Sequence, residues 1–354
     1  MAYTTISKSN LHFNTITWTG NDSADRDITG VGFQPDFLWI KNRSQGDFHM
    51  LQDSVRGANK VLYSNTTDGE DTDNTNGHVN YFTSGGFNVD AGASGNVNEN
   101  SEDYVAWCWK AGGAAVSNSD GSITSSVSVN EEAGFSVVTW TGNATAGATV
   151  GHGLGKAPAC IFLKGRSFED HWAVYHKGIG TSLSDSNRKL LKLNDSGSYQ
   201  TSTSYWNDTS PTASVFSLGT DQRTNKNTGT FVAYCWAEIP GYSKFGKYKG
   251  NGNTDGACVH LGFRPALVIY KKSSGSDNWE MHDNKRDTDN PVIRQLFPNT
   301  DGNESSSSFV DFLSNGFKHR NTNGNTNESG YNYIYMAWAE QPGVTPFNTL
   351  PSAR

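Results

Sequence analysis

Charge is scarce in this chain of 354 residues. Only 18% of the residues are Asp, Glu, Lys or Arg, and the net charge is -7. No basic cluster is visible, which argues against nucleic acid or an anionic membrane as the main partner. No apolar run approaches the roughly 18 residues that a membrane-spanning helix needs. The start, MAYTTISKSNLHF, lacks the basic and apolar regions of a signal peptide, so we expect a protein made in a cytoplasm without membrane insertion.

Cysteine and nucleotide-binding motifs are equally sparse. The four cysteines lie in apolar, strand-like stretches without metal-ligand spacing, which predicts buried free thiols: Cys108, Cys160, Cys235 and Cys258. The stretch GHGLGKAP resembles a phosphate-binding loop, but Val150 replaces its first glycine and Ala157 replaces its final Ser or Thr. We therefore expect no cofactor.

Long amphipathic helical patterns are missing, and one strand-like pattern occurs three times. The copies are GFQPDFLWIK at 32–41, GLGKAPACIFLK at 153–164 and GFRPALVIYK at 262–271. Residues at fixed distances from their prolines correspond: Pro35, Pro158 and Pro265; Lys41, Lys164 and Lys271 after six residues; His49, Trp172 and Trp279 after fourteen; Asp53, His176 and Asp283 after eighteen. Such self-similarity indicates tandem repeats of about 100 residues.

The pattern within each copy predicts an all-β fold of three tandem β-sandwiches, jelly-roll or lectin-like. Apolar residues that follow the proline without alternation are typical of a strand covered on both faces. We place the repeats at 1–110, 133–241 and 242–354, the last with a short C-terminal tail. Residues 111–132 are interpreted as a Gly/Ser-rich linker able to hold the first two repeats apart. The short connection between the second and third repeats predicts rigid packing.

The repeated polar positions are the first candidate site. Lys41 with Asp53, Lys164 with His176 and Lys271 with Asp283 could form three related ligand sites. We favour a structural role, in which lysine and aspartate pair between neighbouring strands and an Arg follows each Asp in a local turn.

Aromatic residues and acidic loops supply the other candidates. Trp172, Trp206 and Trp279 lie outside the most strand-like segments, so they are candidates for stacking on sugar rings. Weak candidates for calcium ligands lie in the polar stretch 65–77: Asp68, Glu70, Asp71 and Asp73. A solvated loop is the favoured alternative. No repeated pair of carboxylates suggests a glycosidase, so we expect no enzymatic activity.

A family resemblance covers nearly the whole chain. The segments TITWTGN, ITGVGFQPDFLWIKNRS, DSVRGA, NENSEDYVAWCWKA, TVGHGLGKAP and WNDTSPTASVFSLGT resemble a widespread family of marine bacteriophage virion proteins of the tail-fibre type. This resemblance implies a virion component involved in attachment, and it supplies no catalytic or binding residues.

These observations lead to three functional hypotheses. The first is a tail-fibre or adhesin-type virion protein that binds host cell-surface polysaccharide through its loops, without catalysis. The second is a capsid decoration or head-fibre protein with a purely structural role, and the third is a polysaccharide-degrading enzyme. Other virion proteins are expected partners. Fibre proteins are commonly trimers, so we expect a homo-oligomer with a trimer favoured, although three repeats could also give one chain pseudo-threefold symmetry.

Overall fold

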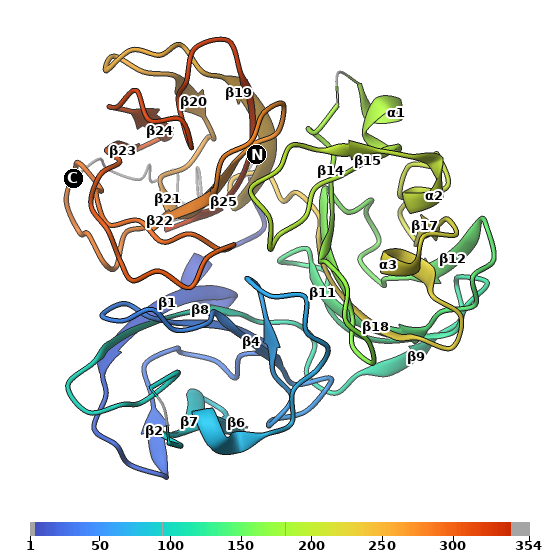
Figure 1. Cartoon of the computed structure of the whole chain (residues 1–354), viewed down its shortest axis with the longest axis horizontal. Coiled ribbons are helices and arrows are strands. Elements are labelled where there is room, and N and C mark those ends of the chain that lie inside the picture. Colours follow the sequence, from blue (N-terminus) through green and yellow to red (C-terminus); the bar gives the residue numbers. More distant parts are fainter. Residues whose placement is uncertain (1–3, 94, 181, 341–354) are drawn as a thin grey trace.

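A computed structural model describes residues 4–93, 95–180 and 182–340, and it confirms the all-β prediction (Figure 1). Three antiparallel sheets form its framework. The first contains, in spatial order, β1 (Phe13–Thr19), β8 (Asp103–Trp109), β3 (Phe37–Asn42), β4 (Met50–Asp53) and β5 (Leu62–Tyr63). The second contains β14 (Ala173–His176), β13 (Cys160–Gly165), β18 (Thr230–Trp236), β11 (Phe135–Thr141), β10 (Ser125–Asn130) and β9 (Val116–Asn118). The third contains β19 (Ser243–Lys249), β25 (Asn332–Ala339), β21 (Pro265–Lys272) and β22 (Trp279–Asp283).

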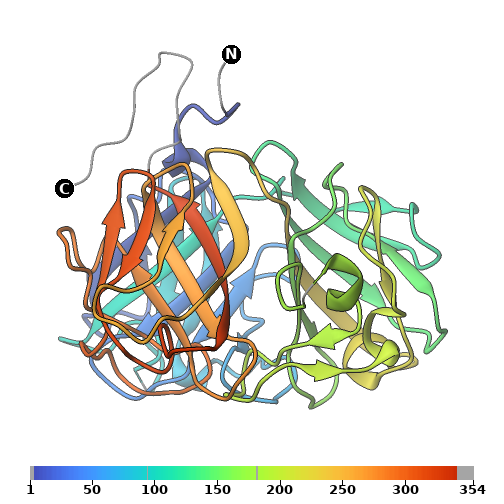
Figure 2. The same ribbon diagram turned by 90° about the horizontal axis from the view of Figure 1, so that it is seen from above.

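The three framework sheets share one strand order. The order β1-β8-β3-β4 in the first sheet corresponds to β11-β18-β13-β14 and to β19-β25-β21-β22. We refer to the strands β1–β8 as unit 1, β9–β18 as unit 2 and β19–β25 as unit 3. The three units surround a common centre in Figure 1, and Figure 2 shows units 3 and 2 side by side with unit 1 behind them.

Each unit adds a smaller antiparallel sheet. These sheets contain β2 (Arg26–Ile28), β7 (Gly86–Asp90) and β6 (His78–Thr83) in unit 1; β12 (Ala148–Gly151) and β17 (Val215–Leu218) in unit 2; and β20 (Cys258–His260), β24 (Gly316–His319) and β23 (Val310–Leu313) in unit 3. Unit 2 also contains the pair β15 (Lys189–Leu190) and β16 (Gln200–Thr201). The described helices are single turns: α1 (Leu183–Ser186), α2 (Thr203–Trp206), α3 (Gln222–Asn225), and the 3-10 helices η1 (Ser9–Leu11) and η2 (Asn74–Asn76).

The framework strands are buried on both faces, as the sequence predicts. Every residue of β3, β13 and β21 is buried. In β3, Leu38 and Ile40 pack into the interior of the unit 1 sandwich, whereas Phe37 and Trp39 face the centre of the molecule. Successive side chains point to opposite faces of a sheet, so two apolar environments explain the loss of alternation.

One aromatic core joins the three units. Trp109, Trp236 and Trp338 lie at the C-terminal ends of the equivalent strands β8, β18 and β25, as the last, the last and the penultimate residue, and their ring centroids lie 5.2–5.9 Å apart. The angles between the rings are 65–73°, the edge-to-face arrangement that aromatic pairs favour. The three units therefore share a core and are not independent domains joined by linkers.

The linker prediction for residues 111–132 was wrong. This segment contains β9 and β10, and β10 pairs along β11 with Val127 opposite Val138. Val127 is buried in the interior of unit 2. The alternation of Ser and Val in SSVSVN suits a strand with one apolar face, and Ser-rich composition concealed that pattern. The segment thus belongs to unit 2 and does not hold units 1 and 2 apart.

Candidate functional site

The three tryptophans predicted to stack on glycan lie inside the protein. Trp172 and Trp279 are 0% exposed, and Trp206 is 2% exposed. Their indole N–H groups donate to main-chain carbonyls: Trp172 to Tyr63 (2.8 Å), Trp206 to Lys189 (3.0 Å) and Trp279 to Lys192 (2.8 Å). A sugar cannot reach ring faces that are packed in a core, so this prediction was wrong for all three residues.

The repeated lysines are also buried, and they do not pair with the repeated aspartates. Their ammonium groups donate to carbonyl oxygens: Lys41 to Asn42 (2.6 Å) and Gln45 (3.0 Å), Lys164 to Thr67 (3.0 Å) and Asp170 (2.7 Å), and Lys271 to Ser196 (3.0 Å) and Lys272 (2.8 Å). Burial lowers the pKa of Lys41 and Lys164 to about 8 and that of Lys271 to about 7. Two of these bonds cross between units, because Thr67 belongs to unit 1 and Ser196 to unit 2.

The repeated aspartate of unit 1 belongs to an ion network at the junction with unit 2. Asp53 pairs with Arg56 within a turn and accepts a bond from the Tyr234 hydroxyl (2.8 Å). Glu70 binds Arg56 (3.2 Å) and, across the junction, Arg166 (2.8 Å). Burial alone would raise the pKa of Glu70, but the two arginines hold this pKa below its usual value. The aspartate–arginine turn is therefore present, and it stabilises a junction.

The junction between units 3 and 1 repeats this network. Asp283 binds Arg286 (2.6 Å) and accepts a bond from the Trp107 indole (3.1 Å). Glu304 binds Arg286 (3.1 Å) and, across the junction, Arg43 (2.9 Å). Burial alone would raise the pKa of the Asp283 carboxyl group, but the Arg286 charge and the hydrogen bonds from Arg286 and the Lys285 N–H together lower this pKa.

The junction between units 2 and 3 is built without that network. His176 occupies the position of the repeated aspartate, and its Nε2 lies 3.1 Å from the Tyr335 carbonyl oxygen. Burial lowers the pKa of His176 to about 3, so the imidazole is neutral near pH 7. Ile179 stands three residues later, where the other two units have Arg. Asp53, His176 and Asp283, which were candidates for three related ligand sites, thus make three versions of one structural contact between units.

The acidic stretch of unit 1 does not form a calcium site. Glu70 is taken up by the two arginines, Asp71 accepts a bond from the Tyr63 hydroxyl (3.0 Å), and Asp73 binds the Thr75 hydroxyl (2.5 Å). Over the ranges 4–93, 95–180 and 182–340, no group of three or more His, Cys, Asp or Glu residues is arranged to hold a metal ion. The calcium prediction for Asp68, Glu70, Asp71 and Asp73 is therefore wrong on this geometry.

Of the predicted buried thiols, three are buried and one is not. Cys108, Cys160 and Cys235 are free and buried, whereas Cys258 is free and exposed at the first residue of β20. Strand β20 pairs only with β24 among the described strands, and its residues alternate between exposed and buried. Cys258 lies on the solvent face of this short edge strand.

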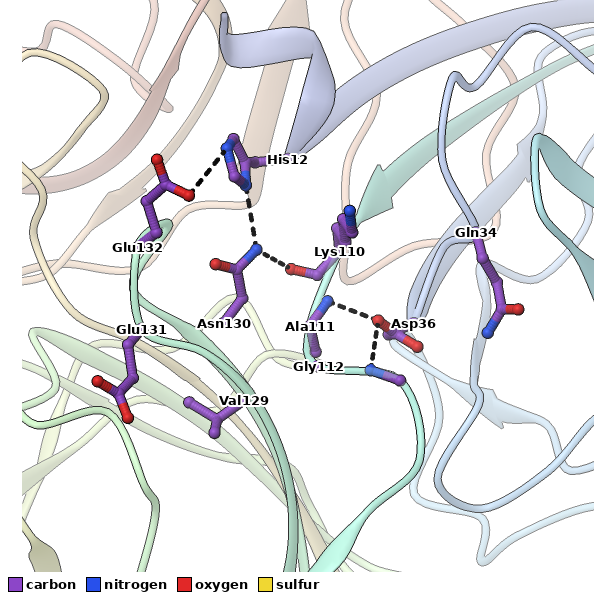
Figure 3. Close-up of a pocket in the computed structure, with 11 residues that line it drawn as sticks. His12, Gln34, Asp36, Lys110, Ala111, Gly112, Val129, Asn130, Glu131 and Glu132 are labelled. Carbon is purple, nitrogen blue, oxygen red and sulfur yellow. Dashed lines mark hydrogen bonds and ion pairs between the residues drawn. The ribbon is translucent and has the colours of Figure 1, made fainter. Parts of the chain in front are cut away.

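An open cleft of about 550 Å³ lies between units 1 and 2 (Figure 3). It is lined by side chains and main chain, mostly polar, from four segments: His12, Gln34, Asp36, Lys110, Ala111, Gly112, Gly113, Val129, Asn130, Glu131 and Glu132. The Asn130 amide joins the two units, since Nδ2 lies 3.1 Å from His12 Nδ1 and 3.2 Å from the Lys110 carbonyl oxygen. Glu132 lies 3.9 Å from His12, whose pKa is lowered mainly by burial.

Asp36 forms the floor of this cleft in a structural role. Its carboxylate accepts bonds from the main-chain N–H groups of Ala111 (2.7 Å) and Gly113 (3.3 Å) and from the Ser54 hydroxyl (2.7 Å). The remaining amide and carboxylate groups at the rim can form hydrogen bonds with a hydroxyl-rich ligand.

The cleft was not found from the sequence. Three of its segments lie outside the repeated motifs, and residues 111–132 had been interpreted as a linker. The segment NEEAG at 130–134 is a sequence signal for this region. It is a polar turn between two valine-rich stretches, a pattern that indicates a hairpin projecting from a sheet.

Comparison with known proteins gives a family for the chain. Residues 8–342 match the model of a family described as a domain of unknown function, DUF7483. The chain belongs to this family. The matched range spans all three units, so the family domain comprises the whole assembly of sheets. No match was found among curated proteins. None of the helices in the described ranges is long and apolar enough to cross a membrane.

Proposed function

We propose that this protein of the DUF7483 family is a structural component of a bacteriophage particle that acts without catalysis and assembles with other virion proteins. The assignment to a phage particle rests on the sequence resemblance to bacteriophage virion proteins. The shared aromatic core is the observation that carries the structural role, because Trp109, Trp236 and Trp338 lock three units into one body. Such a body resists deformation better than units on flexible linkers would.

The threefold arrangement supports the same proposal. Equivalent positions form contacts around the ring, from Asp53 of unit 1 to unit 2, from His176 of unit 2 to unit 3, and from Asp283 of unit 3 to unit 1. A single chain with this arrangement presents three similar faces to a trimeric or threefold element of a particle.

The test is the location of the protein on purified particles. We expect mass spectrometry to detect the chain in particles banded by density, and antibody labelling in electron microscopy to place it at one position. Labelling at the tail would support a fibre role, and labelling over the head would support a decoration role. Absence from particles of a phage that expresses the protein would contradict the proposal.

Attachment to host surface polysaccharide is the second candidate, and the cleft between units 1 and 2 favours it. The cleft replaces the buried tryptophans as the candidate glycan site, because its rim carries Gln34, Asn130, Glu131 and Glu132 in an open depression. We expect saturable binding of the protein to isolated host polysaccharide, and loss of that binding in Gln34→Ala/Glu132→Ala.

The control for this experiment is Lys177→Ala, which removes a side chain that is about one-third exposed and lies outside the cleft. Binding that survives in the cleft variant would remove the cleft from consideration. Release of shortened oligosaccharides from the polymer would instead support the polysaccharide-degrading alternative and contradict a role without catalysis.

A further inference from the structure

The interior of unit 3, between its framework sheet and its smaller sheet, contains ionisable groups that the other two units lack. Tyr270, Glu280 and His282 lie five, fifteen and seventeen residues after Pro265, and His319 belongs to β24 of the smaller sheet. The equivalent residues carry no charge: Ile40, Met50, Gln52 and Val89 in unit 1, and Leu163, Ala173, Tyr175 and Leu218 in unit 2. Unit 3 thus places a carboxyl group and two imidazoles where its counterparts are mostly apolar.

These side chains are fully buried and poorly bonded. Tyr270, Glu280, His282 and His319 are each 0% exposed. Within the described ranges, no hydrogen bond of normal geometry reaches the carboxylate oxygens of Glu280, the ring nitrogens of the two histidines or the Tyr270 hydroxyl. Glu280 Oε1 lies 3.7 Å from His282 Nδ1, and the ring centroids of His319 and Tyr270 lie 5.1 Å apart. Buried polar groups are ordinarily bonded, so this cluster points to a role other than packing.

The closed cluster carries no net charge in mildly acidic solution. Burial is the main cause of a pKa of about 3 at both His282 and His319, so the two imidazoles are neutral near pH 7. Burial also raises the pKa of Glu280 to about 7, so this carboxyl group keeps its proton at lower pH. The junction carboxylates Asp53 and Asp283 differ, because each has an arginine partner.

The groups around the cluster leave this proton balance to Glu280 and the two histidines. Tyrosines from β19, β21 and β25 keep their protons because burial raises their pKa: Tyr248, Tyr270, Tyr333 and Tyr335. The buried residues of β20 and β23 are apolar: Val259, Val310 and Phe312. Polar contacts with Ser308 and Asn325 lower the Glu280 pKa, and Asp277 raises it. Arg286 and Asp283 act on the His282 pKa in opposite directions, and they form an ion pair with each other.

The two histidines lie on opposite sides of the sandwich. His282 belongs to β22 of the framework sheet, and His319 belongs to β24 of the smaller sheet. They are close enough for their charges to oppose each other, since His319 contributes to lowering the His282 pKa. A proton on each imidazole puts two positive charges between the sheets, and Glu280 can neutralise only one of them. Burial of the second charge without a partner is costly, which favours separation of the sheets and entry of water.

We propose that His282, His319 and Glu280 form an acid-sensitive latch between the two sheets of unit 3. The latch is closed at neutral pH. As pH falls, both imidazoles take up protons from solvent, and the smaller sheet opens away from β21 and β22 while the shared aromatic core stays intact. Units 1 and 2 stay closed because their equivalent positions do not titrate in this range. The latch is independent of the function proposed above.

A buried thiol inside unit 3 measures the opening. Val268 of β21 is fully buried and equivalent to Leu38 in the interior of unit 1. The reporter chain is Val268→Cys/Cys258→Ser, which lacks the exposed native thiol. A disulfide reagent that reacts in acid labels it, and the rate is compared with that of the urea-unfolded chain at the same pH. Peptide mapping separates label at residue 268 from label at the buried native thiols, Cys108, Cys160 and Cys235.

We expect labelling at residue 268 to rise about tenfold per pH unit as pH falls from about 6.5 to about 5, with the native thiols protected. Opening binds two histidine protons and releases one from Glu280, a net gain of one proton. Glu280→Gln removes the released proton, so the rise should steepen to about a hundredfold per pH unit.

The decisive variants copy the other units. His282→Gln/His319→Val introduces the unit 1 residues, and His282→Tyr/His319→Leu introduces those of unit 2, so two different packings are tested. With only Glu280 left to titrate, labelling should fall, and not rise, as pH falls. The matched control is His152→Gln, since His152 is buried in unit 2 with its Nε2 3.2 Å from the Thr212 carbonyl oxygen. The acid response at residue 268 should survive in this control.

Three results overturn the latch. The first is labelling at residue 268 that does not change between neutral and mildly acidic pH. The second is an acid response that persists in both histidine variants. The third is label that reaches Cys108 and Cys235 together with residue 268, because the whole chain then unfolds and unit 3 does not open by itself.

Discussion

Two of the three unit junctions are held by buried ion networks, and the third is neutral. At the junctions between units 1 and 2 and between units 3 and 1, a glutamate binds arginines from both sides. Each glutamate also donates its main-chain N–H to the carbonyl oxygen of the arginine across the junction, Glu70 to Arg166 (2.7 Å) and Glu304 to Arg43 (2.9 Å). Between units 2 and 3, Tyr199 N–H makes the equivalent bond to the Ser273 carbonyl oxygen (3.1 Å), but neither residue is charged. The same backbone geometry is therefore compatible with both chemistries.

In the neutral junction every member of the ion network is replaced, and not just a single member. His176 and Ile179 replace the Asp and Arg of the turn, Tyr199 and Ser273 replace the bridging Glu and Arg, and Met336 stands where Tyr234 or Trp107 donates. A buried charge without its partner is costly, whereas replacement of all partners by neutral groups can be harmless. The comparison between junctions thus illustrates why buried ion networks change as sets.

The largest expected effect comes from removing one member of a charged junction. Asp53→Ala leaves the buried Arg56 with fewer partners, so we expect the free energy of unfolding to fall by about 3 kcal/mol. Asp53→His/Arg56→Ile, which copies the turn of the neutral junction and leaves Glu70 paired with Arg166, should lose less than Asp53→Ala alone. Urea denaturation of the three proteins measures this, and a double variant less stable than the single one would show that the network cannot be replaced in this way.

A medium effect concerns pH at the neutral junction. The folded-state pKa of Lys271 is about 7, below the value of about 10.4 expected for an unfolded chain. At pH values between these two pKa values, the unfolded chain binds a proton at Lys271 that the folded chain does not bind. The contribution of Lys271 to the free energy of unfolding therefore increases as pH rises from 7 to 9, and it is lost as pH falls through 7. We expect the stability of the parent relative to Lys271→Met to rise by roughly 1 kcal/mol per pH unit in this window.

Lys41→Met is the matched comparison for this pH effect. The pKa of Lys41 is about 8, so its window should begin about one pH unit higher. Denaturation curves at pH 6, 7, 8 and 9 would measure both differences. A constant difference between parent and Lys271→Met over this range would mean that Lys271 keeps an ordinary pKa.

The smallest expected effect is at an exposed pair beside the neutral junction. Lys177 and Glu238 lie 2.6 Å apart, but both side chains are about one-third exposed. Exposed pairs of this kind contribute roughly 0–1 kcal/mol, so Lys177→Ala should change the melting temperature by little. A loss as large as that of Asp53→Ala would contradict the view that burial makes the charged junctions sensitive.

Part of this architecture could be predicted from the sequence. The unalternating apolar run Phe37–Leu38–Trp39–Ile40 correctly indicated a strand covered on both faces, because period-two alternation disappears when both faces are buried. The all-β class followed from turn-rich segments and the lack of helical periodicity. Local pattern carries this information because it reflects burial directly.

The candidate sites could not be predicted in the same way. Trp172 and Trp279 lie between polar stretches, and their burial depends on neighbouring units that the local sequence does not reveal. Their identical distance from the prolines was the useful signal, since a position repeated in every copy serves the repeated structure. The cleft escaped detection because it is formed by segments from two units and does not recur.

The tryptophan ring at the centre also affects how the molecule folds. Units 1 and 2 each have an interior of their own, but Trp109, Trp236 and Trp338 belong to a further core that all three units line. We therefore expect the three units to unfold together as one cooperative unit. The chain should therefore melt in one transition, and evolution can add or remove sequence at the rims far more easily than it can add or remove a whole repeat.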